Sequence, residues 1–170
     1  MGHAESAFQP AHIAVLTVSD TRTEENDTSG GYLAEQLQQA GHILADKQIV
    51  IDDQYKIRAI VSQWIADENV QAVLITGGTG FTSRDSTPEA LKPLFDKEVE
   101  GFGELFRLVS YDEIGTSTIQ SRAIAGFANH TVIFAIPGST GACKTGWTKI
   151  IKQQLDASHR PCNFMPHLSV

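Results

Sequence analysis

Four short apolar runs recur along the chain, and each predicts a β-strand. Residues 13–18, 72–75 and 131–136 are nearly continuous apolar runs rich in branched side chains, a pattern typical of strands covered on both faces. Residues 42–50 are less continuous and include Lys47 and Gln48. We therefore expect this strand nearer an edge of the sheet.

Helical patterns separate these runs. The strongest is an i, i+3, i+4, i+7, i+8 stripe of apolar residues from Ile57 to Ile65, which predicts one buried helix face. A helix over about 30–40 has Ser29 as a candidate cap and ends at Gly41. Weaker patterns predict helices over about 88–97, 99–108 and 117–125, and a last helix that follows residues 137–140 and ends near 155.

Strands that alternate with helices favour parallel pairing through right-handed crossovers. We therefore predict an α/β fold with a doubly wound, mostly parallel sheet between helix layers, that is, a three-layer α/β/α arrangement. With 170 residues the chain fits a single domain over 1–170, with its core at about 12–157. The tail, 158–170, is broken by proline but apolar, and we expect it to pack on the domain or on a neighbouring subunit.

Composition excludes several classes of function. The chain has a net charge of −7 and no cluster of Lys or Arg, so we expect no nucleic-acid partner. No apolar run reaches the length of a membrane span, and residues 1–10 lack the features of a signal peptide. Cys143 and Cys162 are too few for a disulfide framework or a zinc site, which favours the reducing cytoplasm.

The most informative segment follows the third strand. Thr76, Gly77, Gly78, Thr79 and Gly80 form a loop rich in hydroxyls and glycine, which can expose backbone N–H groups to an anion. Thr87 and Pro88 then read as the cap and first residue of a helix, whose N-terminus also favours an anion. A purely structural turn is the alternative, because the spacing matches neither the dinucleotide-binding nor the Walker glycine pattern.

The other strand exits carry further polar residues. Ligands of doubly wound sheets bind beyond the carboxyl ends of the strands, where we expect Ser19 and Asp20, Asp52 and Asp53, and Pro137 to Ser139. Asp85 follows the glycine loop. Carboxylates beside phosphates call for a cation, and Mg²⁺ accepts one or two carboxylates together with substrate phosphates. This set favours phosphoryl or nucleotidyl transfer, although Asp52 or Asp53 could instead cap the helix that follows.

Several separate motifs make the chain resemble a known family. They are Thr76-Gly-Gly-Thr-Gly-Phe, Arg84-Asp, Thr87-Pro-Glu-Ala, Gly101-Phe-Gly-Glu, Ser121-Arg and Pro137-Gly-Ser. In this order they are similar to the MoaB/Mog family of molybdenum cofactor biosynthesis, over about residues 12–168, and the segment 111–118 and the tail favour its bacterial B branch. One departure is Thr140, where the family often has a second proline.

The resemblance implies transfer of an adenylyl group from ATP to molybdopterin with Mg²⁺, release of pyrophosphate, and delivery of the product to a molybdate-inserting partner. It places the family's two acidic residues, as metal ligands and catalytic groups, on Asp52 and Asp85. Substrate and nucleotide would bind Ser19, Asp20, Thr76, Gly77, Gly78, Thr79, Gly80, Ser121, Pro137, Gly138 and Ser139. A homotrimer or homohexamer is expected. Two alternatives stay open: a non-catalytic molybdopterin-binding or scaffold protein, and a nucleotide-binding protein outside this pathway.

Overall fold

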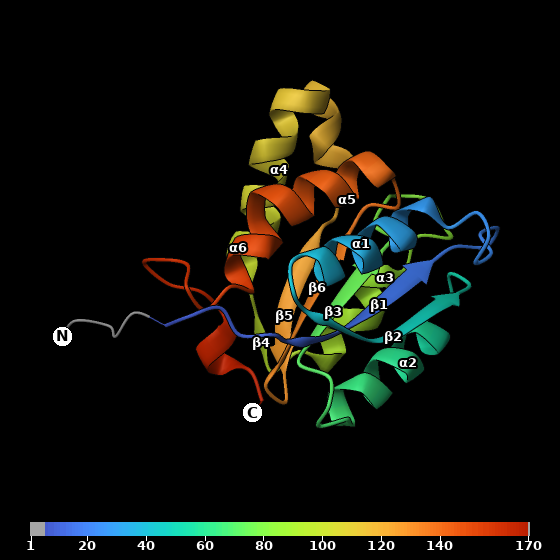
Figure 1. Ribbon diagram of the computed structural model, residues 1–170. Coiled ribbons are helices and arrows are strands. Elements are labelled where there is room, and N and C mark those ends of the chain that lie inside the picture. Colours follow the sequence, from blue (N-terminus) through green and yellow to red (C-terminus); the bar gives the residue numbers. More distant parts are fainter. Residues whose placement is uncertain (1–5, 170) are drawn as a thin grey trace.

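The computed structural model describes residues 6–169, which fold around one six-stranded sheet (Figure 1). Its strands run in the order β2-β1-β3-β6-β5-β4. The first four are mutually parallel, whereas β5 is antiparallel to β6 and β4 to β5. The bounds are β1 (His12–Val18), β2 (Ile43–Val50), β3 (Ala72–Thr76), β4 (Lys97–Glu98), β5 (Ile124–Ala128) and β6 (Thr131–Ile136). The predicted fold class is confirmed, and β2 lies at the sheet edge as its polar residues indicated.

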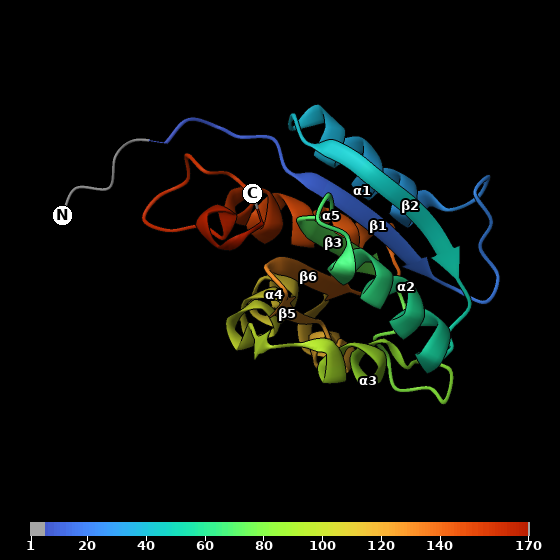
Figure 2. The ribbon, with the colours of Figure 1, turned by 90° about the horizontal axis from the view of Figure 1, so that it is seen from below.

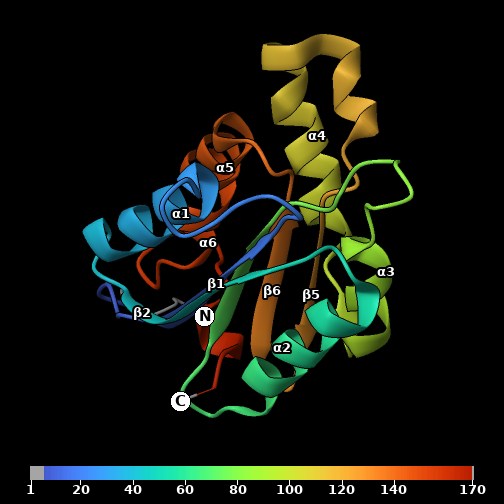
Figure 3. The same ribbon diagram turned by 90° about the vertical axis from the view of Figure 1, so that its right-hand side faces the viewer.

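Helices cover both faces of the sheet (Figure 3). They are α1 (Thr28–Gln39), α2 (Gln54–Ala66), α3 (Thr87–Leu91), α4 (Glu100–Ile114), α5 (Thr140–Gly146) and α6 (Lys152–Gln154), with a π-helical turn, η3 (Trp147–Ile151), joining the last two. Short 3-10 helices are η1 (Lys92–Leu94), η2 (Gly115–Gln120) and η4 (Met165–His167). Seen from below, α1 and α2 lie on opposite sides of the strands that they connect (Figure 2).

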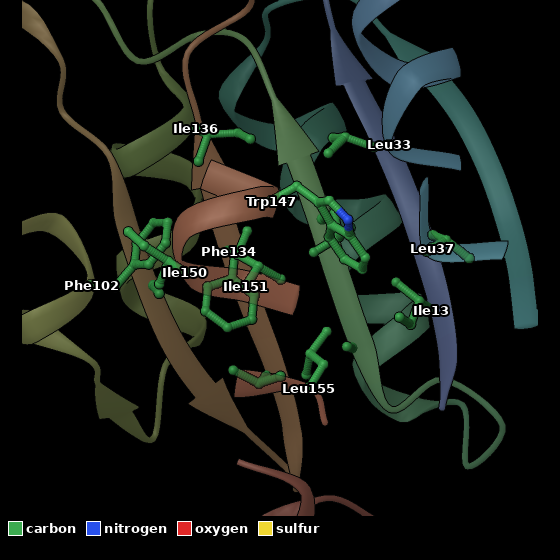
Figure 4. Packing of buried hydrophobic residues seen from close by; sticks show 14 of the residues in the cluster. Ile13, Leu33, Leu37, Phe102, Phe134, Ile136, Trp147, Ile150, Ile151 and Leu155 are labelled. Atoms are coloured by element: carbon green, nitrogen blue, oxygen red, sulfur yellow. The ribbon is translucent and has the colours of Figure 1, made fainter. Parts of the chain in front are cut away.

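The alternating side chains of the strands build two separate cores. Ile13, Leu74 and Phe134 contribute to the cluster beneath α1, α4 and α5, and Figure 4 shows Trp147 of η3 within it. Leu16 and Ile133 point to the opposite face, toward α2 and α3. Since successive side chains of a strand point to opposite faces, covering both faces requires the continuous apolar runs seen in the sequence.

Two predicted helices end earlier in the structure than the sequence pattern predicted. Residues 117–125 do not form one helix, because η2 ends at Gln120 and β5 begins at Ile124. β5 pairs with β6 as a hairpin through Asn129 and His130, both with positive φ (50° and 63°), as a type I′ hairpin turn requires. The helix predicted over about 88–97 stops after α3 and η1, and Lys97 already belongs to β4. The helix that starts at Glu100 continues to Ile114, beyond the predicted 108.

Helix starts also differ from prediction in two places. Asp27, rather than Ser29, caps α1 by accepting a hydrogen bond from the Gly30 N–H. Thr87 is the first residue of α3 and is preceded by Ser86, whose side chain makes no cap bond. Asp53 caps α2 by accepting hydrogen bonds from two backbone N–H groups. This assigns capping to Asp53 and leaves the neighbouring aspartate for another role.

The tail packs on the body of the molecule. Phe164 places its ring 5.2 Å from that of Phe127 in β5, and Leu168 is buried. Both cysteines are free; Cys143 is buried in the core and Cys162 is exposed. Between residues 6 and 169, no helix has the length and apolar character needed to cross a lipid bilayer.

Candidate functional site

The carboxyl ends of β1, β3 and β6 meet around one open cavity of about 430 Å³. Strand order reverses between β1 and β3, since β2 lies on one side of β1 and β3 on the other; ligands of doubly wound sheets bind at such a point. Of the predicted site residues, Ser19, Thr76, Gly77, Gly78, Thr79, Gly80, Asp85, Ser121, Pro137 and Gly138 line this cavity. Side chains distant in sequence are thus collected at one edge of the sheet.

The glycine loop after β3 has a backbone that larger residues would not adopt. Gly77 and Gly78 have φ of 106° and 70°. A Cβ at Gly77 would lie 2.2 Å from the carbonyl oxygen of Val18, so the turn passes directly over the end of β1. The close approach continues to the next strand exit, because a Cβ on Gly138 would lie 3.2 Å from Gly77 Cα. Glycine is therefore required by both conformation and space.

The loop also presents unpaired donors. Across residues 6–169, no acceptor receives a hydrogen bond from the N–H groups of Gly78, Thr79 or Gly80, and all three residues line the cavity. Backbone N–H groups left in this way need water or a ligand as partner. A run of such groups in a turn favours an anion.

Asp52 lies behind this loop at the exit of β2. It is buried, and its Oδ1 accepts hydrogen bonds from the N–H and hydroxyl of Ser86. Its Oδ2 accepts none from residues 6–169 and would lie 2.8 Å from a Cβ on Gly78. Burial raises the pKa of Asp52 above its ordinary value, and the negative charges of Asp85 and Asp20 raise it further. A nearby cation would relieve both effects.

Asp85 approaches the same loop from its other end. Its Oδ2 accepts hydrogen bonds from the N–H and hydroxyl of Thr82, at 2.9 and 2.7 Å. Its Oδ1 receives no hydrogen bond from the described chain, and its carboxylate carbon would lie 3.2 Å from a Cβ on Gly80. Each of the two predicted metal carboxylates therefore keeps one oxygen free, beside either end of the turn Gly78–Gly80.

These two carboxylates fit Mg²⁺. No group of three or more His, Cys, Asp or Glu side chains within the described range 6–169 is placed to hold a metal ion, so a cage made only of protein ligands is not available here. Mg²⁺ does not need one, because it binds through one or two carboxylates and completes its shell with water and substrate phosphates. The glycines let the turn come close to both carboxylates: a Cβ on Gly78 would lie 2.8 Å from Asp52 Oδ2, and a Cβ on Gly80 would lie 3.6 Å from Asp85 Oδ1.

Three predicted residues do not line the cavity. Asp20 accepts two hydrogen bonds from the Arg84 guanidinium, at 3.0 and 2.9 Å, and one from the backbone N–H of Asp52. The paired guanidinium lowers the pKa of Asp20. Ser139 is used to cap α5 by accepting a hydrogen bond from Ala142 N–H. Asp52 is not a lining residue, but its Oδ2 lies close to Gly78, which does line the cavity.

Other lining residues were missed by the sequence reading. Asp27 caps α1 and accepts hydrogen bonds from Thr17 Oγ1 and Lys47 Nζ with a fully buried side chain. Ser29 donates a hydrogen bond to the Gly138 carbonyl and so joins α1 to the exit of β6. Further lining comes from Arg22 and from Ile114, Ser117 and Gln120 of the α4–η2 segment. For Asp27 and Ser29, the only indication in the sequence was the run of polar residues before α1.

Comparisons with known proteins identify the family of the chain. The sequence profile of a family described as "Probable molybdopterin binding domain" matches residues 14–157. Molybdenum cofactor biosynthesis protein B of Escherichia coli (strain K12) is 62% identical over 168 residues, which cover 99% of each chain. The chain belongs to the MoaB/Mog family. The resemblance inferred from the motifs is confirmed.

Solved structures of this family share the fold. A crystal structure of Molybdenum cofactor biosynthesis protein B superposes with a TM-score of 0.85 at 46% identity, covering 88% of this chain and 94% of that one. The tungsten cofactor synthesizing protein MoaB from Pyrococcus furiosus gives 0.76 at 40% identity, with 86% and 93% covered. The chain is thus a MoaB/Mog protein of molybdenum cofactor biosynthesis over nearly its whole length.

Proposed function

We propose that the chain adenylylates molybdopterin, using ATP and Mg²⁺. An oxygen of the terminal phosphate of molybdopterin would attack the α-phosphorus of ATP and form a new P–O bond. The bond from that phosphorus to the oxygen bridging to the β-phosphate would break, and pyrophosphate would leave with the bonding pair. Positioning and neutralisation of charge supply most of the catalysis in such transfers.

The observation that carries the proposal is that unpaired backbone N–H groups and free carboxylate oxygens lie beside the same glycine turn. The unpaired N–H groups of Gly78, Thr79 and Gly80 would hold phosphate oxygens in the cavity. Asp52 Oδ2 and Asp85 Oδ1, beside the same turn, would bind the metal. Mg²⁺ would neutralise phosphate charge and orient the α-phosphate. The cavity, about 430 Å³, is of the size that small ligands occupy.

The test uses purified full-length protein with ATP, Mg²⁺ and molybdopterin, and measures pyrophosphate release. Asp52→Asn and Asp85→Asn should each lower kcat by about 100-fold or more, since losing a metal carboxylate costs several kcal/mol of transition-state stabilisation. Asp53→Asn is the matched control. It changes the adjacent aspartate, and Asn caps a helix as well as Asp does, so its kcat should stay within about twofold of wild type.

Two outcomes would contradict the proposal. If wild-type protein binds molybdopterin but releases no pyrophosphate, the chain is a non-catalytic binding or scaffold protein of the pathway. If turnover survives both substitutions at the level of Asp53→Asn, the metal site lies elsewhere. Delivery of the product to a molybdate-inserting partner would follow from the same activity and is part of the proposal.

A trimeric or hexameric assembly is also proposed. Five large apolar side chains are exposed on the helix pair α4–η2: Leu105, Leu108, Tyr111, Ile114 and Ile119. An apolar group of this kind favours contact with another protein surface. Light scattering coupled to size exclusion would give the mass of the particle, and a monomer of 18.5 kDa would contradict the assembly.

A further inference from the structure

Few hydrogen bonds join the segment that carries Asp85 to the rest of the protein. Between Thr79 and Asp85 the backbone leaves the sheet and forms an exposed excursion before α3 begins. Inside this excursion the Asp85 N–H donates to the Thr82 carbonyl, and the Thr82 N–H donates to the Asp85 carboxylate. These bonds are local and shape the turn. They do not attach it to the rest of the protein.

The backbone of this segment is hydrogen-bonded to other segments through a single residue, Arg122, while the side chain of Arg84 pairs with Asp20. The Arg122 N–H donates to the Thr79 carbonyl at 2.9 Å. Its side chain donates from Nε to the Gly80 carbonyl at 2.8 Å and from Nη2 to the Asp85 carbonyl at 3.0 Å. Over the described residues, these are all the hydrogen bonds that the backbone of 79–85 makes with other segments.

The Arg122 side chain is itself held in place. Its Nη1 pairs with the Glu89 carboxylate on α3, and its guanidinium lies 5.3 Å from the centre of the Phe81 ring. Three-quarters of the side chain is buried. A planar guanidinium can make several directed hydrogen bonds at once, which a lysine ammonium on a flexible stem cannot reproduce.

We propose that Arg122 is a positioning residue for the Asp85 carboxylate, holding residues 79–85 so that Asp85 faces the cavity. The inference rests on the proposed function for what Asp85 does there, and on geometry alone for how Asp85 is held. Arg122 lies outside the cavity lining and would touch neither the nucleotide nor the pterin. Its effect would pass through the Gly80 and Asp85 carbonyls.

The chain offers a closely matched control. Arg58 on α2 also donates to two backbone carbonyls, those of Ala90 and Glu89, at 3.0 and 3.1 Å. Its guanidinium also lies over an aromatic ring, 5.4 Å from the centre of Tyr55. Arg58→Lys therefore removes the same kinds of contact as Arg122→Lys, but from α3 instead of the loop.

The experiment compares Arg122→Lys with Arg58→Lys in three measurements on the full-length chain. Limited digestion with trypsin reports opening of the loop through cleavage between Arg84 and Asp85. We expect Arg122→Lys to speed this cleavage roughly tenfold, because two hydrogen bonds that hold the loop are lost. The affinity for Mn²⁺, measured by electron paramagnetic resonance, should fall by about tenfold. The reason is that Arg122 would no longer hold the backbone of Asp85, the proposed metal ligand.

The third measurement is turnover, in which kcat should fall by up to ~100-fold while the KM for ATP changes much less. Arg58→Lys should leave cleavage, Mn²⁺ affinity and kcat at wild-type values. Unchanged cleavage at Arg84 and unchanged Mn²⁺ affinity in Arg122→Lys would overturn the proposal. So would a loss of thermal stability with no change in Mn²⁺ affinity, which would indicate a structural role only.

Two further outcomes, a variant that does not fold and a wild type without turnover, can also be interpreted. If Arg122→Lys does not fold, Glu89→Ala removes the ion pair that fixes the guanidinium and should raise cleavage at Arg84 by a smaller factor; no rise would refute the inference. If the wild type binds Mn²⁺ but releases no pyrophosphate, the proposed reaction fails, whereas the digestion and Mn²⁺ results still decide the role of Arg122.

Discussion

Gly78→Ala tests the geometry of the site most directly, because this residue lies between the glycine loop and Asp52. The structure gives Gly78 a φ of 70°, in the left-handed region. A Cβ there would lie 2.2 Å from Thr87 Oγ1 and 2.8 Å from Asp52 Oδ2. Thr87 is fully buried and donates a hydrogen bond to the Gly77 carbonyl, so it has no room to move aside.

The expected cost combines two effects. A left-handed backbone costs a residue with a Cβ about 1–2 kcal/mol. Forcing an extra methyl group into a packed site typically costs about 1–3 kcal/mol. The free energy of unfolding should therefore fall by about 2–5 kcal/mol, and the melting temperature by about 4–20 °C for a chain of this size.

The assay is urea unfolding followed by circular dichroism, with Gly31→Ala as the control. Gly31 lies within α1, and nothing lies within 4 Å of the position that its Cβ would take. Alanine there should stabilise the protein by about 0.5–1 kcal/mol, since glycine weakens a helix. Two substitutions of the same kind should thus have opposite signs. A Gly78→Ala protein as stable as wild type would show that the loop does not adopt this turn.

Two further predictions concern the aspartates. Asp27→Ala should lower the free energy of unfolding by about 2–3 kcal/mol, because it removes a fully buried carboxylate that pairs with the half-buried Lys47 and caps a helix. Asp53→Ala, which removes only a helix cap, should cost about 1 kcal/mol by the same urea assay. Burial raises the pKa of Asp52 above 3.8, so the stability that its neutral form provides is present below pH 3.8 and is lost as the pH rises through the raised value. The stability of wild type should therefore fall relative to Asp52→Asn as the pH rises above 3.8, and a constant difference would show that the carboxyl is not perturbed.

The parallel half of the molecule was predictable from the sequence. β1, β3 and β6 are covered on both faces and therefore read as continuous apolar runs, which few other structures produce. Because parallel strands place their carboxyl ends at the same edge of a sheet, the sequence alone predicts that residues as distant as Ser19 and Gly138 lie at one edge.

The antiparallel edge was not predictable in the same way. β5 contains Gly126, where a Cβ would lie 2.3 Å from the Phe95 ring, and glycine within an apolar run weakens the strand pattern. Its turn, Asn129-His130, lacks the glycine that usually marks a two-residue hairpin. Tertiary packing decided this segment. In consequence the α4–η2 wall of the cavity, with Ile114 and Gln120, stayed unassigned.

Asp20, Asp52, Asp53 and Asp85 are alike as letters of the sequence, and the structure separates them by what their neighbours already occupy. Asp53 caps the start of α2, and Asp20 accepts hydrogen bonds from the Arg84 guanidinium. Asp52 and Asp85 each give one oxygen to a neighbouring hydroxyl and N–H and keep the other free beside the glycine turn. A metal that takes only one or two carboxylates needs such half-occupied groups. We therefore propose that the free oxygens, more than the acidic residues as such, would bind a metal at this edge of the sheet.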